Sequence, residues 1–361
     1  MRVVIAPDGF GGTLTARQAA AAIAAGWREA RPDDQLLERP MSDGGEGLLD
    51  ALATESDTWH HCEVAGPQGH PLQAGFLLRA DNSALIEAAA ACGLHLLPPP
   101  QRTPARATTY GVGQLILAAV EQGADPIRVG LGGTAAVDGG TGALNALGFR
   151  LRVADGSGLK VGGDDLQRLA SIERGWAPSV DAEVELLADV TTPLGEAAER
   201  FGPQKGADAR QVAGLTDALR NLAGVAERDL GADPRLATAA GSGAAGGLGY
   251  GLAAALGARL VPGARTVAGL IRLDAALADA DVVVTGEGRL DATTAQGKVV
   301  AVVRDLARAA DCRIDAVVGQ HTDSLDGLGT VVAAAPDGPG QDPAGEVARA
   351  AARLAAGSRG G

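Results

Sequence analysis

The stretch Ile127–Gly148, IRVGLGGTAAVDGGTGALNALG, holds three local patterns in succession. It begins with a short apolar run that is typical of a buried strand, and it ends in an Ala/Leu pattern that is typical of a helix. Between them lies a glycine-rich turn, which lets the backbone come close to a ligand. Asp138 is the one acid in that turn. The stretch therefore predicts a strand, a ligand-facing turn and a helix, and Asp138 is a candidate for the chemistry of the turn.

Length and composition narrow the class of protein. The 361 residues are enough for two domains, and the net charge of −13 argues against a nucleic-acid-binding protein, which needs a basic face. Three cysteines without the spacing of metal ligands indicate a reducing compartment. No apolar run reaches the roughly 18–20 residues of a membrane span. We therefore expect a cytoplasmic protein that binds neither nucleic acid nor membrane.

Predicted strands and helices alternate at both ends of the chain. RVVIAP (residues 2–7) and DVVVTG (residues 281–286) are typical of buried strands, and helical patterns follow them. Such alternation is typical of a parallel sheet with helices on its faces. We expect an α/β fold, in which a Rossmann-like parallel sheet is flanked by helices and a second α/β domain is inserted into the first. The expected first domain holds residues 1–60, 106–148 and 265–361, and the inserted domain holds residues 61–105 and 149–264.

Acidic residues follow several predicted strands, each beside a glycine-rich turn. In an open parallel sheet the carboxyl ends of the strands line the ligand crevice, so these acids should gather on one side of the molecule. Carboxylates beside glycine turns suit a magnesium–nucleotide site, because backbone N–H groups and lysines bind phosphate and carboxylates bind Mg²⁺. The acids expected to gather are Asp8, Asp43, Glu46, Asp138, Asp189, Glu287 and Asp291.

Two other classes of protein fit parts of the pattern. Gly130, Gly132 and Ala135 match the dinucleotide fingerprint G-x-G-x-x-A, and Asp155 lies near the place of its ribose-binding acid. This match predicts an NAD-dependent dehydrogenase of a small hydroxy acid, but it leaves Asp138 unexplained. A non-catalytic nucleotide-binding module would have the same glycine turns. The Walker A pattern and the protein-kinase motifs are absent from the sequence, and its histidines lack the spacing of metal ligands.

Seven motifs occur in the order found in bacterial type-1 glycerate kinases, and the chain resembles that family from residue 1 to about residue 320. The resemblance implies that ATP and Mg²⁺ phosphorylate D-glycerate, usually to 2-phosphoglycerate. It implies two α/β domains, one interrupted by the other, and a homodimer is a possible assembly. Gly11 stands where the first loop of the family usually carries a lysine. The motifs are VVIAPDGFGGTLTARQAA, PMSDGGEG, TTYGVGQLI, GLGGTAAVDGGTGALNALG, FGPQKGA, GAAGGLGYG and TGEGRLD.

The small anion implied as substrate needs a fixed cation. Only arginine offers a planar fork for a carboxylate, so we expect Arg289 to hold glycerate, together with Asp8 and Gln204. Either Asp189 or Asp291 would accept the proton of the attacking hydroxyl, and the sequence leaves both open.

The nucleotide and its metal need a second set of groups. Lys205 and Lys298 would neutralise charge on the transferred phosphoryl group and the leaving group, and Asp43 and Asp138 would bind Mg²⁺. The glycine turns would supply backbone donors to the phosphates. The residues expected to bind the nucleotide are Gly132, Gly133, Thr134, Gly139, Gly140, Gly286 and Glu287.

Overall fold

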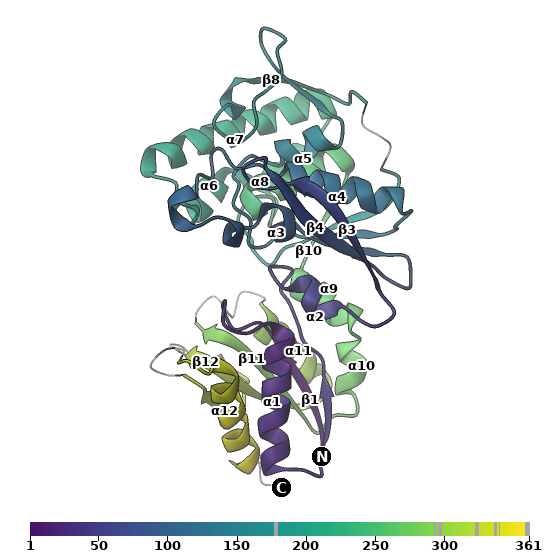
Figure 1. Ribbon diagram of the computed structural model, residues 1–361, viewed down its shortest axis with the longest axis vertical. Helices are drawn as coiled ribbons and strands as arrows, with labels where there is room; N and C mark the ends of the chain where they lie inside the picture. Colours follow the sequence, from purple (N-terminus) through teal and green to yellow (C-terminus); the bar gives the residue numbers. More distant parts are fainter. Residues whose placement is uncertain are drawn as a thin grey trace. The chain divides into compact units, whose positions relative to one another are not determined.

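The computed structural model describes residues 1–176, 180–291, 294, 298–321, 325–335, 338 and 340–357. The chain divides into two compact units, each with its own sheet (Figure 1). Unit 1 comprises Met1–Asp43, Asp50–Ala53 and Pro262–Gly361, and unit 2 comprises Gly44–Leu49 and Thr54–Val261. The short helix α2 (Leu48–Leu52) crosses the division between them.

Unit 1 is built on a five-stranded sheet in which every neighbouring pair is parallel. Its central strand β11 pairs with β1 from Val282 opposite Val3 to Gly286 opposite Pro7. Parallel strands of this kind are buried on both faces, which explains their continuous Val/Ile runs. The sheet order is β13-β12-β11-β1-β2, with β1 at Arg2–Pro7, β2 at Gln35–Glu38, β11 at Val282–Leu290, β12 at Arg313–His321 and β13 at Val331–Ala333.

Two helices share one face of this sheet. The helices α1 (Ala16–Ala30) and α12 (Pro343–Gly357) pack against each other, and their apolar residues form a core with β1 and β11 (Figure 1). The helix α1 begins at a capping box, because Thr15 accepts from the backbone of Gln18 while the Gln18 side chain accepts from the backbone of Thr15. The helices α11 (Val299–Ala309), α9 (Gly263–Leu270) and α10 (Leu273–Leu277) complete the unit.

The order in which the chain adds strands to the unit 1 sheet reverses at β1. From β1 the chain passes through α1 to β2 on one side, whereas β11, β12 and β13 follow one another on the other side of β1. In an open parallel sheet a ligand crevice forms at this reversal, outside the carboxyl ends of the strands. The residues just after β1 and at the end of β11 therefore hold the best position for a ligand site.

Unit 2 contains a six-stranded sheet of mixed direction. The strands β10, β9, β6 and β5 are parallel to one another. The strand β4 is antiparallel to β5, and β3 is antiparallel to β4. Their bounds are β3 Thr58–Ala65, β4 Pro71–Leu78, β5 Ala84–Glu87, β6 Ile127–Gly130, β9 Val184–Leu187 and β10 Arg259–Val261. A separate ribbon pairs β7 (Arg150–Val153) with β8 (Leu169–Glu173).

Helices of unit 2 enclose an apolar core with this sheet. The longest is α7, which begins at a capping box between Asp208 and Gln211 and ends at Gly231 in the left-handed region. The α-helices are α3 Ala88–Cys92, α4 Tyr110–Glu121, α5 Thr141–Ala146, α6 Ala197–Phe201, α7 Ala209–Leu230 and α8 Ala244–Leu256. The 3₁₀ turns are Leu94–Leu96, Pro99–Gln101, Leu166–Arg168, Leu194–Glu196, Pro203–Lys205 and Pro234–Thr238.

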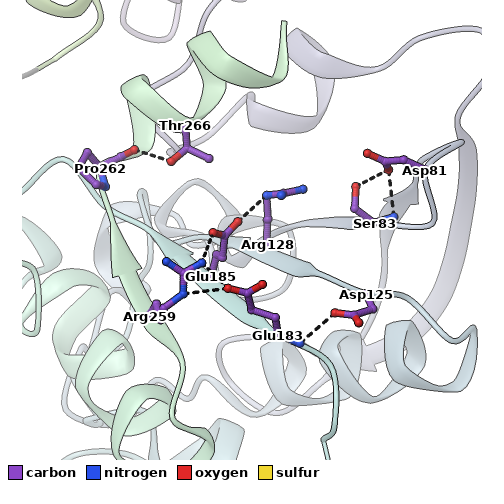
Figure 2. A network of polar contacts seen from close by, with 9 residues as sticks. All are labelled: Asp81, Ser83, Asp125, Arg128, Glu183, Glu185, Arg259, Pro262 and Thr266. Carbon is purple, nitrogen blue, oxygen red and sulfur yellow. Dashed lines mark hydrogen bonds and ion pairs between the residues drawn. The ribbon is translucent and has the colours of Figure 1, made fainter. Parts of the chain in front are cut away.

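An ion-pair ladder crosses three parallel strands of unit 2 (Figure 2). Nε of Arg128 on β6 lies 2.6 Å from Oε2 of Glu185 on β9, and Nη2 of Arg259 on β10 lies 2.8 Å from Oε1 of the same glutamate. Arg259 also pairs with Glu183. Because Glu185 is mostly buried, its two charged hydrogen bonds favour this strand register over a shifted one.

The α/β class is confirmed, and so is the parallel sheet flanked by helices. One expected boundary needs correction, because residues 106–148 lie in unit 2 and not with the terminal segments. The strand β6 pairs with β5 and β9, so the opening stretch belongs to the second sheet. An apolar run predicts a buried strand, but it does not say which sheet the strand joins. The acids expected on one sheet edge are consequently divided between two sheets.

Among the described residues, no helix combines the length and the apolar character that crossing a membrane requires.

Gly26 allows the close contact between α1 and α12, since an added Cβ would overlap the carbonyl group of Ala348. We expect Gly26→Ala to destabilise unit 1 by about 1–3 kcal/mol, because the two helices would have to move apart. The exposed helical residue Gly269 is the control in the same unit, where a Cβ meets no atom within 4 Å. Gly269→Ala should be neutral or stabilising by up to about 1 kcal/mol. Thermal unfolding of both variants measures the difference, and equal effects would contradict the packing argument.

Candidate active site

A cavity of about 440 Å³ lies at the reversal point of the unit 1 sheet. It opens beyond the carboxyl ends of β1 and β11, between the loop that follows β1 and the N-terminal end of α12. Several residues predicted from the sequence share this cavity, although they come from distant parts of the chain. The charged residues that line it are Asp8, Asp43, Glu287, Arg289, Asp291 and Lys298, and Glu346 lies on the α12 side.

Glycines shape the floor of this cavity. Gly288 lies against the backbone of Phe10 and Gly11, so that a Cβ there would stand about 3.0 Å from both. Gly286 does not line the cavity, because it lies within the strand pair and its carbonyl accepts from the backbone N–H of Asp8 at 2.8 Å. The predicted nucleotide role of Gly286 thus gives way to a packing role, since a side chain there would overlap β12.

Like charges crowd together in the cavity. Burial raises the pKa of Asp8 well above its usual range, and the neighbouring carboxylates of Asp43 and Glu287 raise it further. Burial also raises the pKa of Glu287, against the hydrogen bond from Thr294 and the charge of Lys298. The Thr294 hydroxyl donates to Oε1 of Glu287 at 2.6 Å. A bound cation would relieve this repulsion, so the cavity suits a positively charged ligand or a metal-bound anion.

Lys298 brings positive charge to the same cavity. It is the N-cap residue of α11, where unpaired backbone N–H groups and the helix dipole favour anions. Arg289, the penultimate residue of β11, is exposed and lines the cavity. The cavity therefore combines carboxylates that suit a cation with two cationic side chains that suit an anion.

No group of three or more His, Cys, Asp or Glu side chains that could hold a metal ion occurs in the part of the chain that the structure describes. An ion that takes one or two protein carboxylates and completes its shell with water and phosphate oxygens needs no such group. The donor set of the cavity has that chemistry, since its carboxylates repel one another and lie beside groups that attract phosphate.

The turn after β6 carries the second group of predicted residues, in unit 2. Gly133 is exposed and Gly132 is partly exposed, whereas Gly139 and Gly140 are buried. A Cβ on Gly132 would overlap the backbone of Gly45, and a Cβ on Gly139 would overlap the side chain of Leu222. Most of these glycines are thus required by neighbouring protein atoms. The backbone at Gly132 and Gly133 remains accessible to a ligand, and we withdraw Gly139 and Gly140 from the predicted nucleotide site.

Asp138 is fully buried within unit 2, and protein donors surround its carboxylate. The backbone N–H groups of Thr109, Gly140 and Gly142 donate to it at 2.9, 3.0 and 3.2 Å. The hydroxyl of Thr109 donates to Oδ2 at 2.9 Å as well. Its acceptor sites are filled, so we no longer assign Asp138 to Mg²⁺. Its role is to join the start of α4 to the start of α5, which explains why an acid stands in the opening glycine turn.

The other predicted residues of unit 2 lie in different surroundings. Lys205 is 4% exposed, and its ammonium donates to the carbonyl of Ala136 at 2.8 Å and to Oγ1 of Thr134 at 3.2 Å. Burial lowers the pKa of Lys205 to about 8, although Cys92 and Asp138 act in the opposite direction. Gln204 is exposed beside it, and Asp189 is partly exposed just after β9.

Sequence reasoning missed two ionisable residues that lie near the predicted acid Glu46, namely Glu87 and His95. Glu87 ends β5, and burial raises the pKa of its carboxyl. Glu46 lies 3.6 Å from Nδ1 of His95, and its Cβ is 3.6 Å from the place of a Cβ on Gly133. Glu87 follows the same rule of acids at strand ends, but it has no adjacent glycine to draw attention to it. No sequence pattern singles out His95, because its contact with Glu46 forms only in the folded chain.

The dinucleotide fingerprint is not realised in the structure. Asp155 lies in an exposed turn between β7 and β8, where Oδ1 accepts from the backbone and hydroxyl of Ser157 at 2.8 and 2.6 Å. Gly130 packs against the turn at Gly44, because a Cβ there would overlap its carbonyl oxygen. Neither residue is placed to hold a ribose or a pyrophosphate, so the dehydrogenase alternative loses its structural basis.

The assignment of Asp138 as an internal support can be tested by substitution. Asp138→Asn should lower the free energy of unfolding of unit 2 by about 1–3 kcal/mol, because an amide group turns a donor toward buried N–H groups. Asp217→Asn is the control in the same unit, since it breaks only an exposed ion pair with Arg220. Urea unfolding without added metal compares the two, and an unaltered stability of Asp138→Asn would refute the assignment.

Comparisons with known proteins agree with one another. The model of a family described as the glycerate kinase family matches residues 3–354. Glycerate 2-kinase of Escherichia coli K12 is 39% identical over 332 residues, covering 90% of this chain and 87% of its own, and glycerate kinase of Halalkalibacterium halodurans is 40% identical over 327 residues, covering 88% and 85%. A crystal structure described as glycerate kinase 2 of Salmonella typhimurium LT2 has a TM-score of 0.85 at 39% identity, covering 99% of this chain and 98% of its own. The chain belongs to the glycerate kinase family.

Proposed function

We propose that the protein transfers the γ-phosphoryl group of ATP to D-glycerate in a reaction that requires Mg²⁺, with 2-phosphoglycerate as the product. The family membership supports a glycerate kinase, and the name of the E. coli relative supports the 2-phosphate. The observation that carries the proposal is the unit 1 cavity, where crowded carboxylates meet Arg289 and Lys298 at the sheet reversal. We expect the enzyme to act in the cytoplasm, in keeping with cysteines that form no disulfide.

Within this cavity the side chains divide into an acceptor group and a phosphate group. Arg289 would bind the glycerate carboxylate through its planar fork, with Asp8 accepting from a hydroxyl of the substrate. Asp291 lines the same cavity as Arg289, whereas Asp189 belongs to unit 2. We therefore choose Asp291 as the base that takes the proton of the attacking hydroxyl.

The phosphate group of this cavity consists of Lys298 and the first turn of α11. In unit 2, the accessible backbone of Gly132 and Gly133 would donate to phosphate oxygens of the nucleotide. Lys298 would stabilise the negative charge on the transferred phosphoryl group. Asp43 and Glu287 would hold Mg²⁺, which neutralises charge on the phosphates when it is bound. The Thr294 hydroxyl donates to Glu287, which would hold this carboxylate in place for the metal.

A coupled assay tests the proposal directly. Release of ADP should require both D-glycerate and Mg²⁺, and nuclear magnetic resonance of the product should show a phosphate on carbon 2. ADP release that does not respond to glycerate would sink the proposal, and a phosphate on carbon 3 would correct the product alone.

Arg289→Lys should raise the KM for glycerate by roughly tenfold or more and leave the KM for ATP nearly unchanged, because lysine cannot form two parallel hydrogen bonds with a carboxylate. Arg304→Lys is the control in unit 1, since Arg304 does not line the cavity and pairs with Asp305. Steady-state kinetics of both variants give the two constants. An unchanged KM for glycerate removes Arg289 from the acceptor site.

Mg²⁺ alone should raise the midpoint of thermal unfolding of the wild-type protein, because a ligand that binds the folded state stabilises it. Asp43→Asn should lose most of this shift, as one metal carboxylate is gone. Asp138→Asn should unfold at a lower temperature but keep the shift, since its carboxylate faces only protein donors. Equal shifts in wild-type protein and Asp43→Asn would exclude Asp43 as a ligand.

A further inference from the structure

Unit 2 contains two lysines in very different environments. Lys160 is exposed, whereas Lys205 is 4% exposed and lies among protein atoms. The ammonium of Lys205 spans two points of the turn after β6, the hydroxyl of Thr134 and the carbonyl of Ala136. Because its side chain is enclosed, Lys205 is poorly placed to touch a phosphate directly. Its contacts point to a different role in the reaction.

The turn after β6 is held from the opposite side by backbone hydrogen bonds. The N–H of Leu94 donates to Gly133 at 2.8 Å, and the N–H of Ala135 donates to Cys92 at 2.7 Å. The N–H of Gly133, just before the first of these anchors, makes no hydrogen bond within the part of the chain that the structure describes. Gly133 is also exposed, so this donor is available to a ligand. Lys205 donates a hydrogen bond to Thr134, the residue that follows Gly133.

The backbone around Lys205 is held by a 3₁₀ turn, by close packing against Arg102 and by the start of α7. It ends the 3₁₀ turn Pro203–Lys205, and Gly206 follows in the left-handed region with φ of 97°. Gly206 lies against Arg102, where a Cβ would stand 2.8 Å from the carbonyl oxygen. The helix α7 then begins at a capping box. The place of the Lys205 ammonium against the turn after β6 therefore depends on how the backbone before α7 is packed.

We propose that Lys205 is a positioning residue of the kinase reaction, whose ammonium holds Thr134 and Ala136 so that the N–H of Gly133 stays directed at the nucleotide phosphates. This inference rests on the proposed function, in which that N–H binds ATP. Lys205 therefore acts through the turn and does not contact the nucleotide. A misplacement of about 1 Å in such a donor can reduce catalysis roughly a hundredfold, so a buried tether at this point has a large effect.

A double-mutant cycle tests the tether. Thr134→Val and Lys205→Met should each raise the KM for ATP and the Kd for ADP by roughly tenfold, with little change in the KM for glycerate. The double variant should be no worse than Lys205→Met, because Lys205→Met already removes the contact with Thr134. Thr134→Ser should restore the wild-type constants, since it keeps the hydroxyl. Lys160→Met is the matched control, because it removes the same charge from the surface of the same unit.

The pH dependence of ADP binding separates a tether from a direct phosphate contact. The pKa of Lys205 is about 8, and the groups that face it are Cys92 and Asp138. Above pH 8 a neutral amine still donates two hydrogen bonds, so a tether predicts no inflection in the Kd near this pH. Cys92 stays a thiol over this range, because burial raises its pKa to about 12. A Kd that rises above pH 8 in the wild-type protein but not in Lys205→Met overturns the proposal.

Other outcomes are equally decisive. Additive effects in the cycle, or equal increases of KM for ATP and glycerate, would show that Lys205 does not act through Thr134. If Lys205→Met fails to fold, Thr134→Val and its rescue by Thr134→Ser decide the question alone, and a wild-type KM for ATP in Thr134→Val refutes the tether. Calorimetry with ADP separates the proposed kinase function from the proposed role of Lys205 as a tether. No nucleotide binding by the wild-type protein defeats both, whereas tight binding with an additive cycle defeats only the tether.

Discussion

Direct packing of backbone on backbone is the constraint on which both units depend. In unit 1 the helices α1 and α12 approach closely because Gly26 presents no Cβ to Ala348. In unit 2 the turn after β6 rests on the turn at Gly45 because Gly132 also lacks one. With aromatic residues at only 2% of the sequence, large side chains cannot fill wide gaps between elements. Close approach through glycine replaces them, and it explains much of the unusually high glycine content.

The same constraint creates the chemistry of the two turns. The loop after β1 packs against Gly288, and Asp8 and Glu287 line the same cavity. Burial raises the pKa of both carboxyls, and neighbouring carboxylates raise it further. In a phosphotransferase, such carboxylates repel the phosphates of the substrate unless a cation binds with them. In unit 2 the opposite solution holds, because Asp138 has protein donors on its carboxylate and Lys205 has acceptors on its ammonium. The charged side chains of unit 1 thus line a cavity, whereas Asp138 and Lys205 of unit 2 are paired with protein donors and acceptors.

Several features could be predicted from the sequence because their physical signal is local. The strands of unit 1 are continuous apolar runs, and the capping box of α1 is written in four adjacent residues. The site residues of unit 1 were predicted from acids and cations at strand ends, and the structure brings Asp8, Asp43 and Asp291 to one cavity. Their roles in catalysis stay predictions. Glu87 and His95 were missed because no glycine turn adjoins Glu87 and because the contact of His95 with Glu46 forms only in the folded chain.

By itself the sequence determined the alternation of strands and helices, the glycine–acid turns at strand ends and the resemblance to a kinase family, since each depends on neighbouring residues or on a linear order of motifs. Only the tertiary structure decided that β6 joins the second sheet, that Asp138 faces protein donors and that Lys205 is enclosed. The physical reason is the same in each case. Strand partners and the solvation of a charge depend on residues distant in the chain, and a turn that binds phosphate has the same sequence as one that packs against backbone.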